Sequence, residues 1–295
     1  DPVANMKEGK YKDFSMNEDE RYELYIAAWL HDCGKVATPP HVVDKATKLE
    51  TIFDRIELVR TRMELLKRDA EIAFLKRQLN GQTPDNFDDE FNDRIHQLDE
   101  NMAFLESCNV GGEFMKPDLQ DRVRSIGKKS MNLFGEKQNF LSDEEMENLN
   151  IPKGTLLPEE REIINDHIVI TIEMLEQLPY PKHLKNVPEF AGGHHEKMDG
   201  TGYPKGLSAN QMSTQAKMMA IADIYEALTA ADRPYKDGKK LSMAMRIMGF
   251  MKNDYHIDED LFEIFVKSGV YKKYAKDYVA NTQIDEVDEK SVLGV

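Results

Sequence analysis

Apolar residues recur at steps of three and four along almost the whole chain, and runs of alternating β-branched and aromatic residues are missing. This spacing puts apolar side chains on one face of a helix and predicts an all-α fold. The first helix is expected to begin after Asn17, because Glu20 three residues later completes a capping box. We expect this helix to end near residues 31–34, with Gly34 as the stop, since glycine commonly stops helices.

Two narrow apolar stripes run through densely charged sequence between about Thr47 and Cys108, separated by a turn signal at residues 80–85. They predict a long antiparallel helical hairpin with a coiled-coil-like seam, inserted into a helical bundle. The hairpin is either a dimerisation or signal-relay arm, or an extra pair of helices covering the core. The stripes consist of Leu49, Ile52, Phe53, Ile56, Val59, Met63 and Leu66, then Phe91, Ile95, Leu98, Met102 and Leu105.

Helices resume beyond the hairpin after a stretch spotted with glycine, proline and asparagine. Ser142 with Glu145 forms a second capping box, and Pro158 begins a helix that is expected to reach about Leu178. The final segment, residues 281–295, is acidic and is expected to be a solvated tail.

Composition and charge restrict the kind of partner. The 295 residues include 39 Lys and Arg against 54 Asp and Glu, a net charge of −15, which disfavours binding to nucleic-acid polymers. No apolar run approaches the roughly 18 residues of a membrane span, so this chain is not expected to contact a membrane. The chain has only two cysteines, Cys33 and Cys108, which cannot form a disulfide scaffold. This composition favours a reducing compartment, and we expect a cytoplasmic domain. Because the chain begins at Asp1, we expect a fragment of a longer protein. The sequence does not determine what lies upstream, and a sensor or a membrane anchor there is an open alternative.

Several ionisable side chains fall on apolar helical faces. Each alone has a structural explanation, such as a hydrogen-bonded core histidine or a capping aspartate. Together, imidazoles with carboxylates are what a two-metal site requires, because a buried charge is costly unless it is paired or binds a cation. Structural zinc is disfavoured because cysteines are scarce. The candidate metal ligands are His31, Asp32, His167, His194, His195 and Asp223.

These residues also carry a family resemblance. Residues 31–35, His-Asp-Cys-Gly-Lys, resemble the motif of HD-superfamily phosphohydrolases. Residues 194–204, His-His-Glu-Lys-Met-Asp-Gly-Thr-Gly-Tyr-Pro, resemble the signature of the HD-GYP family, and residues 222–229 and 233–236 continue the match in order. The resemblance implies an HD-type helical bundle formed by residues 1–46 and 109–280, with the hairpin 47–108 inserted and 281–295 as the tail.

The resemblance implies a metal-dependent phosphodiesterase for a cyclic dinucleotide, usually cyclic di-GMP, that forms the linear dinucleotide and in some cases the mononucleotide. Two or three divalent transition-metal ions, Fe or Mn favoured, would be held by the six residues above, with Asp32 as the bridge. Asp32 and Lys35 are implied in catalysis, and Lys35, Arg233, Lys236 and Tyr203 in substrate binding. The loop Gly202-Tyr203-Pro204 is also implied as a contact for a partner protein.

The chain departs from the family at its start. A glutamate and a histidine that the family takes from a preceding helix have no counterpart in residues 1–16. We therefore expect the fragment to lack that helix and one metal position to be incompletely ligated.

Two alternatives to cyclic di-GMP hydrolysis stay open. The substrate could be the hybrid cyclic GMP–AMP, or the domain could be a non-catalytic cyclic-dinucleotide sensor or docking module. Because every ligand position from His31 onward is filled, an enzyme is favoured. A homodimer formed through the hairpin is a further expectation.

Overall fold

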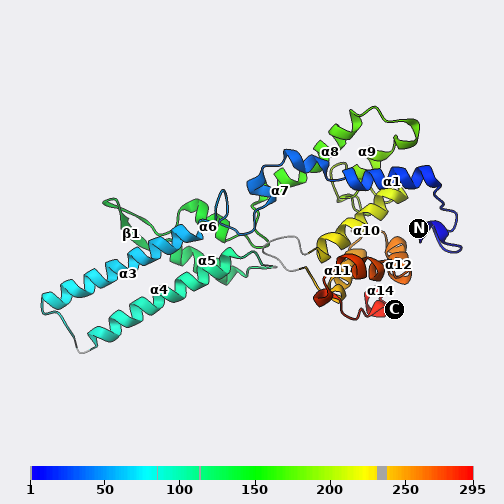
Figure 1. The fold of residues 1–295 in the computed structure, drawn as a ribbon. Coiled ribbons are helices and arrows are strands. Elements are labelled where there is room, and N and C mark those ends of the chain that lie inside the picture. Colours follow the sequence, from blue (N-terminus) through cyan, green and yellow to red (C-terminus); the bar gives the residue numbers. More distant parts are fainter. Residues whose placement is uncertain (1, 85, 113, 231–237, 295) are drawn as a thin grey trace. The chain divides into compact units, whose positions relative to one another are not determined.

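The computed structural model describes residues 2–84, 86–112, 114–230 and 238–294, and these ranges are helical apart from one small antiparallel pair of strands (Figure 1). The all-α prediction is confirmed. In the described ranges every helix is too short or too polar to cross a membrane. The elements are η1(Val3–Asn5), α1(Glu18–Leu30), η2(Cys33–Ala37), α2(Pro40–Val43), α3(Ile56–Leu79), α4(Phe87–Asn109), α5(Pro117–Gly127), β1(Ser130–Leu133), β2(Glu136–Asn139), α6(Asp143–Leu149), α7(Pro158–Asn165), α8(His167–Glu176), η3(Lys182–Leu184), α9(Val187–Gly192), α10(Thr214–Thr229), α11(Leu241–Asn253), α12(Glu259–Lys267), α13(Val270–Tyr278), η4(Asn281–Gln283) and α14(Glu289–Leu293).

The chain divides into two compact units. The first comprises Asp1–Thr38 with Asn165–Val295, and the second comprises Pro39–Ile164. The hairpin therefore shares its unit with α5, α6 and the strands. The predicted assignment of 47–108 as a separate insertion stays a prediction. The single helix expected from Pro158 to Leu178 is interrupted at Asp166, because Asn165 and Asp166 are weak helix formers.

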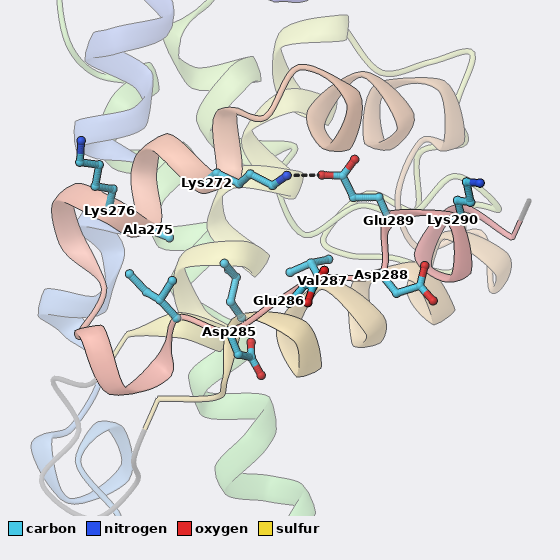
Figure 2. Close-up of a pocket in the computed structure, with 11 residues that line it drawn as sticks. Lys272, Ala275, Lys276, Asp285, Glu286, Val287, Asp288, Glu289 and Lys290 are labelled. Atoms are coloured by element: carbon cyan, nitrogen blue, oxygen red, sulfur yellow. Dashed lines mark ion pairs between the residues drawn. The ribbon is translucent and has the colours of Figure 1, made fainter.

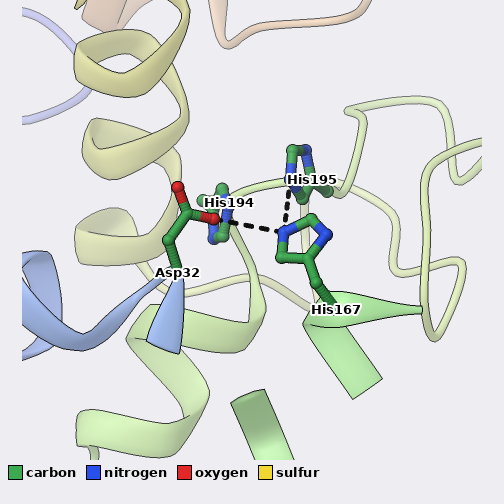
Figure 3. Close-up of side chains that lie close together, drawn as sticks. All are labelled: Asp32, His167, His194 and His195. Atoms are coloured by element: carbon green, nitrogen blue, oxygen red, sulfur yellow. Dashed lines mark hydrogen bonds and ion pairs between the residues drawn. The ribbon is translucent and has the colours of Figure 1, made fainter. Parts of the chain in front are cut away.

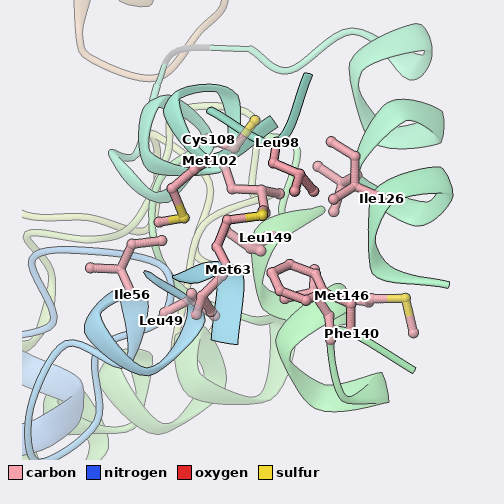
Figure 4. Packing of buried hydrophobic residues seen from close by; sticks show 14 of the residues in the cluster. Leu49, Ile56, Met63, Leu98, Met102, Cys108, Ile126, Phe140, Met146 and Leu149 are labelled. Atoms are coloured by element: carbon pink, nitrogen blue, oxygen red, sulfur yellow. The ribbon is translucent and has the colours of Figure 1, made fainter. Parts of the chain in front are cut away.

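The second unit is built around the hairpin of α3 and α4, which run antiparallel over their length (Figure 1). Met63 of α3 and Leu98 of α4 are each 1% exposed and lie in one core cluster with Phe140 (Figure 4). The predicted hairpin is thus present. Ile52 and Phe53, placed in its seam by the sequence, are exposed, because they lie in the connection before α3 begins.

The first unit places α1 and α8 to α10 around a small apolar cluster that includes Ala27, Leu175 and Phe190. The capping box of α1 is formed as predicted: Glu20 N donates to Asn17 Oδ1 at 2.9 Å, and Asn17 N donates to Glu20 Oε2 at 2.8 Å. These contacts fix the start of the helix that ends beside His31 and Asp32.

The C-terminal segment folds back onto the first unit, so the expectation of a solvated tail was wrong. Val292 of α14 is 8% exposed and belongs to the core cluster of α10 to α13. Glu289 accepts a hydrogen bond from Tyr271 and pairs with Lys272, both at 2.7 Å. Residues 284–290 line an open pocket against α13 (Figure 2). The apolar residues interspersed among the acidic ones supply the burial that holds this segment.

Candidate metal centre

Six of the predicted site residues converge in the first unit, carried by the end of α1, the start of α8, the turn after α9, and α10. They form two donor groups, and within each group one ligand atom per residue lies within 4.8 Å of every other. The first group is Asp32, His167, His194 and His195 (Figure 3), and the second is His31, Asp32 and Asp223. Asp32 belongs to both.

Asp32 reaches the two groups with its two oxygens. Its Oδ1 lies 3.2 Å from His167 Nε2 (Figure 3), and its Oδ2 lies 3.2 Å from His31 Nε2. His31 Nε2 is also 3.5 Å from Asp223 Oδ1. A carboxylate that faces two sets of donors in this way has the geometry for bridging two cations.

Backbone carbonyls fix the orientation of two imidazoles. His31 Nδ1 lies 2.7 Å from Ala28 O, and His194 Nδ1 lies 2.6 Å from Ala191 O. A carbonyl can only accept, so each Nδ1 donates and each Nε2 is directed into the cluster. His194 Nε2 is buried and has no hydrogen-bond partner among the described residues. A buried nitrogen with a free lone pair is costly unless a ligand such as a metal ion occupies it.

Two imidazoles of the first group, those of His194 and His195, stay neutral. Burial lowers the pKa of His194, and burial together with the neighbouring His194 and His167 lowers that of His195. His195 Nε2 and His167 Nε2 face each other at 3.3 Å (Figure 3). Neutral imidazoles whose nitrogens converge are suited to bind a transition metal, because only the unprotonated nitrogen is a ligand.

The second group places two carboxylates beside one imidazole. Burial disfavours the charged form of His31, but hydrogen bonds to Asp223 and Asp32 outweigh it and raise the pKa of His31 to about 10. Burial likewise opposes ionisation of Asp32, yet hydrogen bonds from His167, His31 and Lys35 hold the pKa of its carboxyl far below the usual range. The same negative potential that protonates His31 would favour a divalent cation.

Gly34 brings the HD turn against α8. A Cβ at this position would meet His167 O at 2.0 Å and Thr171 N at 2.6 Å. Gly34 N also donates to Thr171 Oγ1 at 2.9 Å. The expected role of Gly34 as the stop of the first helix was wrong: α1 ends at Leu30 and Gly34 lies in η2. Its missing side chain permits the close approach that sets Asp32 beside His167.

The Gly-Tyr-Pro loop closes one side of the cluster. The Tyr203 ring stacks on His195 with centroids 4.8 Å apart and an interplanar angle of 16°. Burial, with the charges of Asp223 and Asp32, raises the pKa of Tyr203 to about 12, so its phenol stays neutral. Gly202 is required here, because a Cβ would meet Glu196 Cα at 2.5 Å.

Glu196 holds this loop in place and was not singled out from the sequence. Its side chain is 1% exposed and accepts hydrogen bonds from the backbone N–H groups of Lys205 and Leu207, each at 2.8 Å. The signal that could have identified it is a carboxylate next to two histidines and ahead of a glycine-rich turn, where free N–H groups need acceptors.

The basic side chains predicted to bind substrate are only partly placed. Lys35 Nζ lies 2.5 Å from Asp32 Oδ2, so its charge is at the edge of the cluster. Arg233 and Lys236 lie outside the described residues.

Comparison with known proteins identifies a domain that carries His167, His194, His195 and Asp223 of this cluster. Residues 143–261 match the family model of the HD domain. The chain contains an HD domain. The recognition made from the motifs is confirmed. An HD domain implies dependence on divalent metal ions, in agreement with the two donor groups.

Relatives of the chain include bacterial proteins that are named as phosphodiesterases. The chain is 47% identical to a cyclic di-GMP phosphodiesterase of Pseudomonas aeruginosa over 79 residues, which are 26% of the chain and 18% of that protein. It is 39% identical to the 3'3'-cGAMP-specific phosphodiesterase 1 of Vibrio cholerae over 82 residues, 28% of the chain and 19% of that protein. It is 26% identical to a cyclic di-GMP phosphodiesterase of Thermotoga maritima over 244 residues, 76% of the chain and 64% of that protein. The chain thus spans less than two thirds of the length of these relatives.

Proposed function

We propose that this chain is a metal-dependent phosphodiesterase that opens a cyclic dinucleotide, with cyclic di-GMP as the first candidate substrate. The observation that carries the proposal is that Asp32 belongs to both donor groups, with one oxygen directed to each. The relatives named above are phosphodiesterases of cyclic di-GMP or 3'3'-cGAMP by name, which supports this substrate class.

Two cations fit the donor set. One would be held by His167, His194 and His195, the other by His31 and Asp223, with Asp32 shared. When bound, divalent ions lower the pKa of water towards neutrality and polarise phosphoryl oxygens. Imidazole and carboxylate donors without thiolates favour Fe or Mn over a structural zinc site. A third ion has no separate donor group among the described residues.

The remaining roles belong to side chains around the cluster. Lys35 would neutralise negative charge on the phosphoryl group, since its ammonium sits beside Asp32. Tyr203, held neutral and stacked on His195, would border the substrate. Arg233 and Lys236 are proposed to bind a second phosphate or the guanine edge. The positive charges of Lys35, Arg233 and Lys236 would let a chain of net charge −15 attract an anionic substrate.

The decisive experiment follows hydrolysis of cyclic di-GMP and of the hybrid cyclic GMP–AMP with Mn(II) or Fe(II) by chromatography. We expect cleavage to the linear dinucleotide by the wild-type chain and at least a 100-fold loss in Asp32→Ala. Asp277→Ala, which removes an exposed carboxylate on α13, is the matched control. Faster cleavage of the hybrid would reassign the substrate, and appearance of mononucleotide would extend the reaction by one step.

The second candidate function is a non-catalytic cyclic-dinucleotide sensor. It would use the same cluster and the Gly202-Tyr203-Pro204 loop, which lies at its border and is also the proposed contact for a partner protein. Nucleotide binding and bound metal without any turnover would favour the sensor over the enzyme.

A further inference from the structure

Helix α3 carries a second apolar stripe that faces away from the hairpin seam. Its members follow one another at seven-residue steps, with one addition in the last heptad, and their exposed fractions run from 37% to 87%. We call this set the outer stripe: Leu58, Leu65, Ile72, Leu75 and Leu79. At 1.5 Å per residue it extends over about 30 Å.

The outer stripe is separate from the packing of the hairpin itself. At about 100° per residue, its centre lies roughly 150° around α3 from the seam residues Val59, Met63 and Leu66. The partner helix α4 has no exposed large hydrophobic residue among its described positions. A solvated hairpin has no need of such a stripe on one helix alone, so the outer stripe indicates an interface.

We propose that the outer stripe is the seam of a homodimer, in which α3 pairs in parallel with α3 of a second copy. A straight helix drifts by about 20° per heptad, so a strict seven-residue repeat matches a partner helix only in a left-handed coiled coil. Such a repeat favours a helical partner. Helix α3 of a second copy has the same repeat, and in a parallel pair the equivalent residues of the two copies lie opposite each other. This interface is independent of the proposed catalytic function.

The charges beside the stripe are compatible with a parallel pair. With Leu58 and its heptad equivalents facing their counterparts, Glu71 comes opposite Lys76 of the partner subunit and Glu57 opposite Arg62 of the partner subunit, and both pairs attract. The pair between them, Glu64 with Asp69 of the partner subunit, repels. Arg62 also binds Glu145 of its own chain at 2.6 Å, so the pair formed by Glu71 contributes more. Each contact occurs twice in a symmetric dimer.

The centre of the stripe favours one orientation. Thr61 and Arg68 come at intervening seam positions in the parallel arrangement, and polar seam residues select register. Arg68 lies next to Asp69 of the partner subunit and offsets the repulsion between Asp69 of the partner subunit and Glu64. In an antiparallel pair, Glu64 and Glu71 of the two copies would instead face each other and repel.

The apolar area agrees with a weak to moderate dimer. Five aliphatic side chains of this exposure offer on the order of 400 Å² per copy, against about 800 Å² per partner in a standard interface. The flanking charged side chains and their methylene stems supply the remainder.

The test is the mass of the whole chain in solution, measured by light scattering and sedimentation between 1 and 100 μM, roughly the range of such dimers. We expect a mass approaching twice 33.9 kDa at the upper end. Leu65→Glu with Ile72→Glu should weaken the dimer by about 100-fold or more. The control Asn92→Glu with Ala103→Glu adds the same charge to exposed positions of α4. It should leave the dissociation constant of the dimer unchanged.

A cross-link tests the orientation. Leu65→Cys, with Cys33→Ser, should form a disulfide-linked dimer under mild oxidation, since parallel pairing brings residue 65 of both copies together, whereas Ala103→Cys should not. A single-chain mass at all concentrations, or a dimer that survives Leu65→Glu with Ile72→Glu, would overturn the proposal. A single-chain mass would mean that the outer stripe binds a different partner. A dimer that survives the double substitution would mean that the two copies associate through another surface.

Discussion

Individual residues of the first unit are constrained mostly by tight contacts between backbone segments and by charge. Gly34 shows the first constraint, since the backbone of α8 occupies the space where a side chain would be. Asp258 shows the second. It is 3% exposed, caps α12 through Leu261 N at 3.1 Å, and binds Lys10 and Tyr11 near the start of the chain.

Gly34→Ala is expected to lower the thermal midpoint by several degrees and to reduce metal affinity. The added methyl group would overlap His167 O, so η2 and Asp32 must move, at a cost of about 1–3 kcal/mol. Calorimetry with and without Mn(II) measures both effects. Gly112→Ala is the control, because a Cβ there meets nothing within 4 Å. Equal stability of the two variants would contradict the close contact.

Asp258→Asn is expected to cost about 1–2 kcal/mol at pH 7. Burial opposes the charge, but hydrogen bonds from Leu261 N and Lys10 outweigh it and lower the pKa of Asp258. Because the folded pKa lies below the unfolded value, this contribution is present above about pH 4 and is lost as the pH falls through the folded pKa. Urea unfolding from pH 7 to pH 3 should therefore show a shallower loss in Asp258→Asn than in Asp277→Asn.

At the scale of elements, the glycine-rich loop 197–211 contains no helix or strand and is held by backbone hydrogen bonds together with one buried carboxylate. Glu196 accepts from two backbone N–H groups of the loop, which places Tyr203 on His195. The hairpin is the opposite case, because the periodic apolar positions of its two long helices specify both the helices and the seam along which they pack.

Glu196→Gln is expected to loosen this loop. The amide keeps one acceptor but turns a donor towards a backbone N–H, which costs about 1–3 kcal/mol. Hydrogen exchange at the amides of Lys205 and Leu207 should accelerate roughly 10- to 100-fold. Glu173→Gln, an exposed change on α8, should leave both amides unaffected. Unchanged protection in Glu196→Gln would show that other contacts order the loop.

The whole molecule is an acidic chain in which a cluster of six ligand-type side chains links the ends of several helices. Ligands that bind only the folded state add stability by mass action, about 2.7 kcal/mol at a concentration 100 times Kd. Cations bound at the cluster would also remove the repulsion between Asp32 and Asp223. The stability of the first unit is therefore expected to depend on metal.

Removal of metal with EDTA should lower the thermal midpoint by several degrees, and readdition of Mn(II) should restore it. Asp32→Ala should make the midpoint insensitive to both treatments, because it removes the carboxylate common to the two groups. Differential scanning calorimetry measures the shift. An equal metal response in Asp32→Ala and the wild-type chain would argue against Asp32 as a shared ligand.

The sequence by itself determined the helical class, the hairpin and the types of residue in the cluster. Helical periodicity and capping act over three or four residues, so the Asn17–Glu20 and Ser142–Glu145 capping boxes could be recognised locally and are formed. Motif spacing likewise identified His31, Asp32 and their companions as a set, since buried ionisable groups need a common explanation.

Only the tertiary structure decided how the helices and the candidate ligands are arranged relative to one another within each unit. The approach of Asp32 Oδ1 to His167 joins residues more than a hundred positions apart, and so does the contact between Gly34 and Thr171. The burial of Val292 and the exposure of the outer stripe on α3 also follow from packing. The local sequence determines which side chains are apolar. Whether an apolar side chain is buried depends on the surface that folding brings against it from distant parts of the chain.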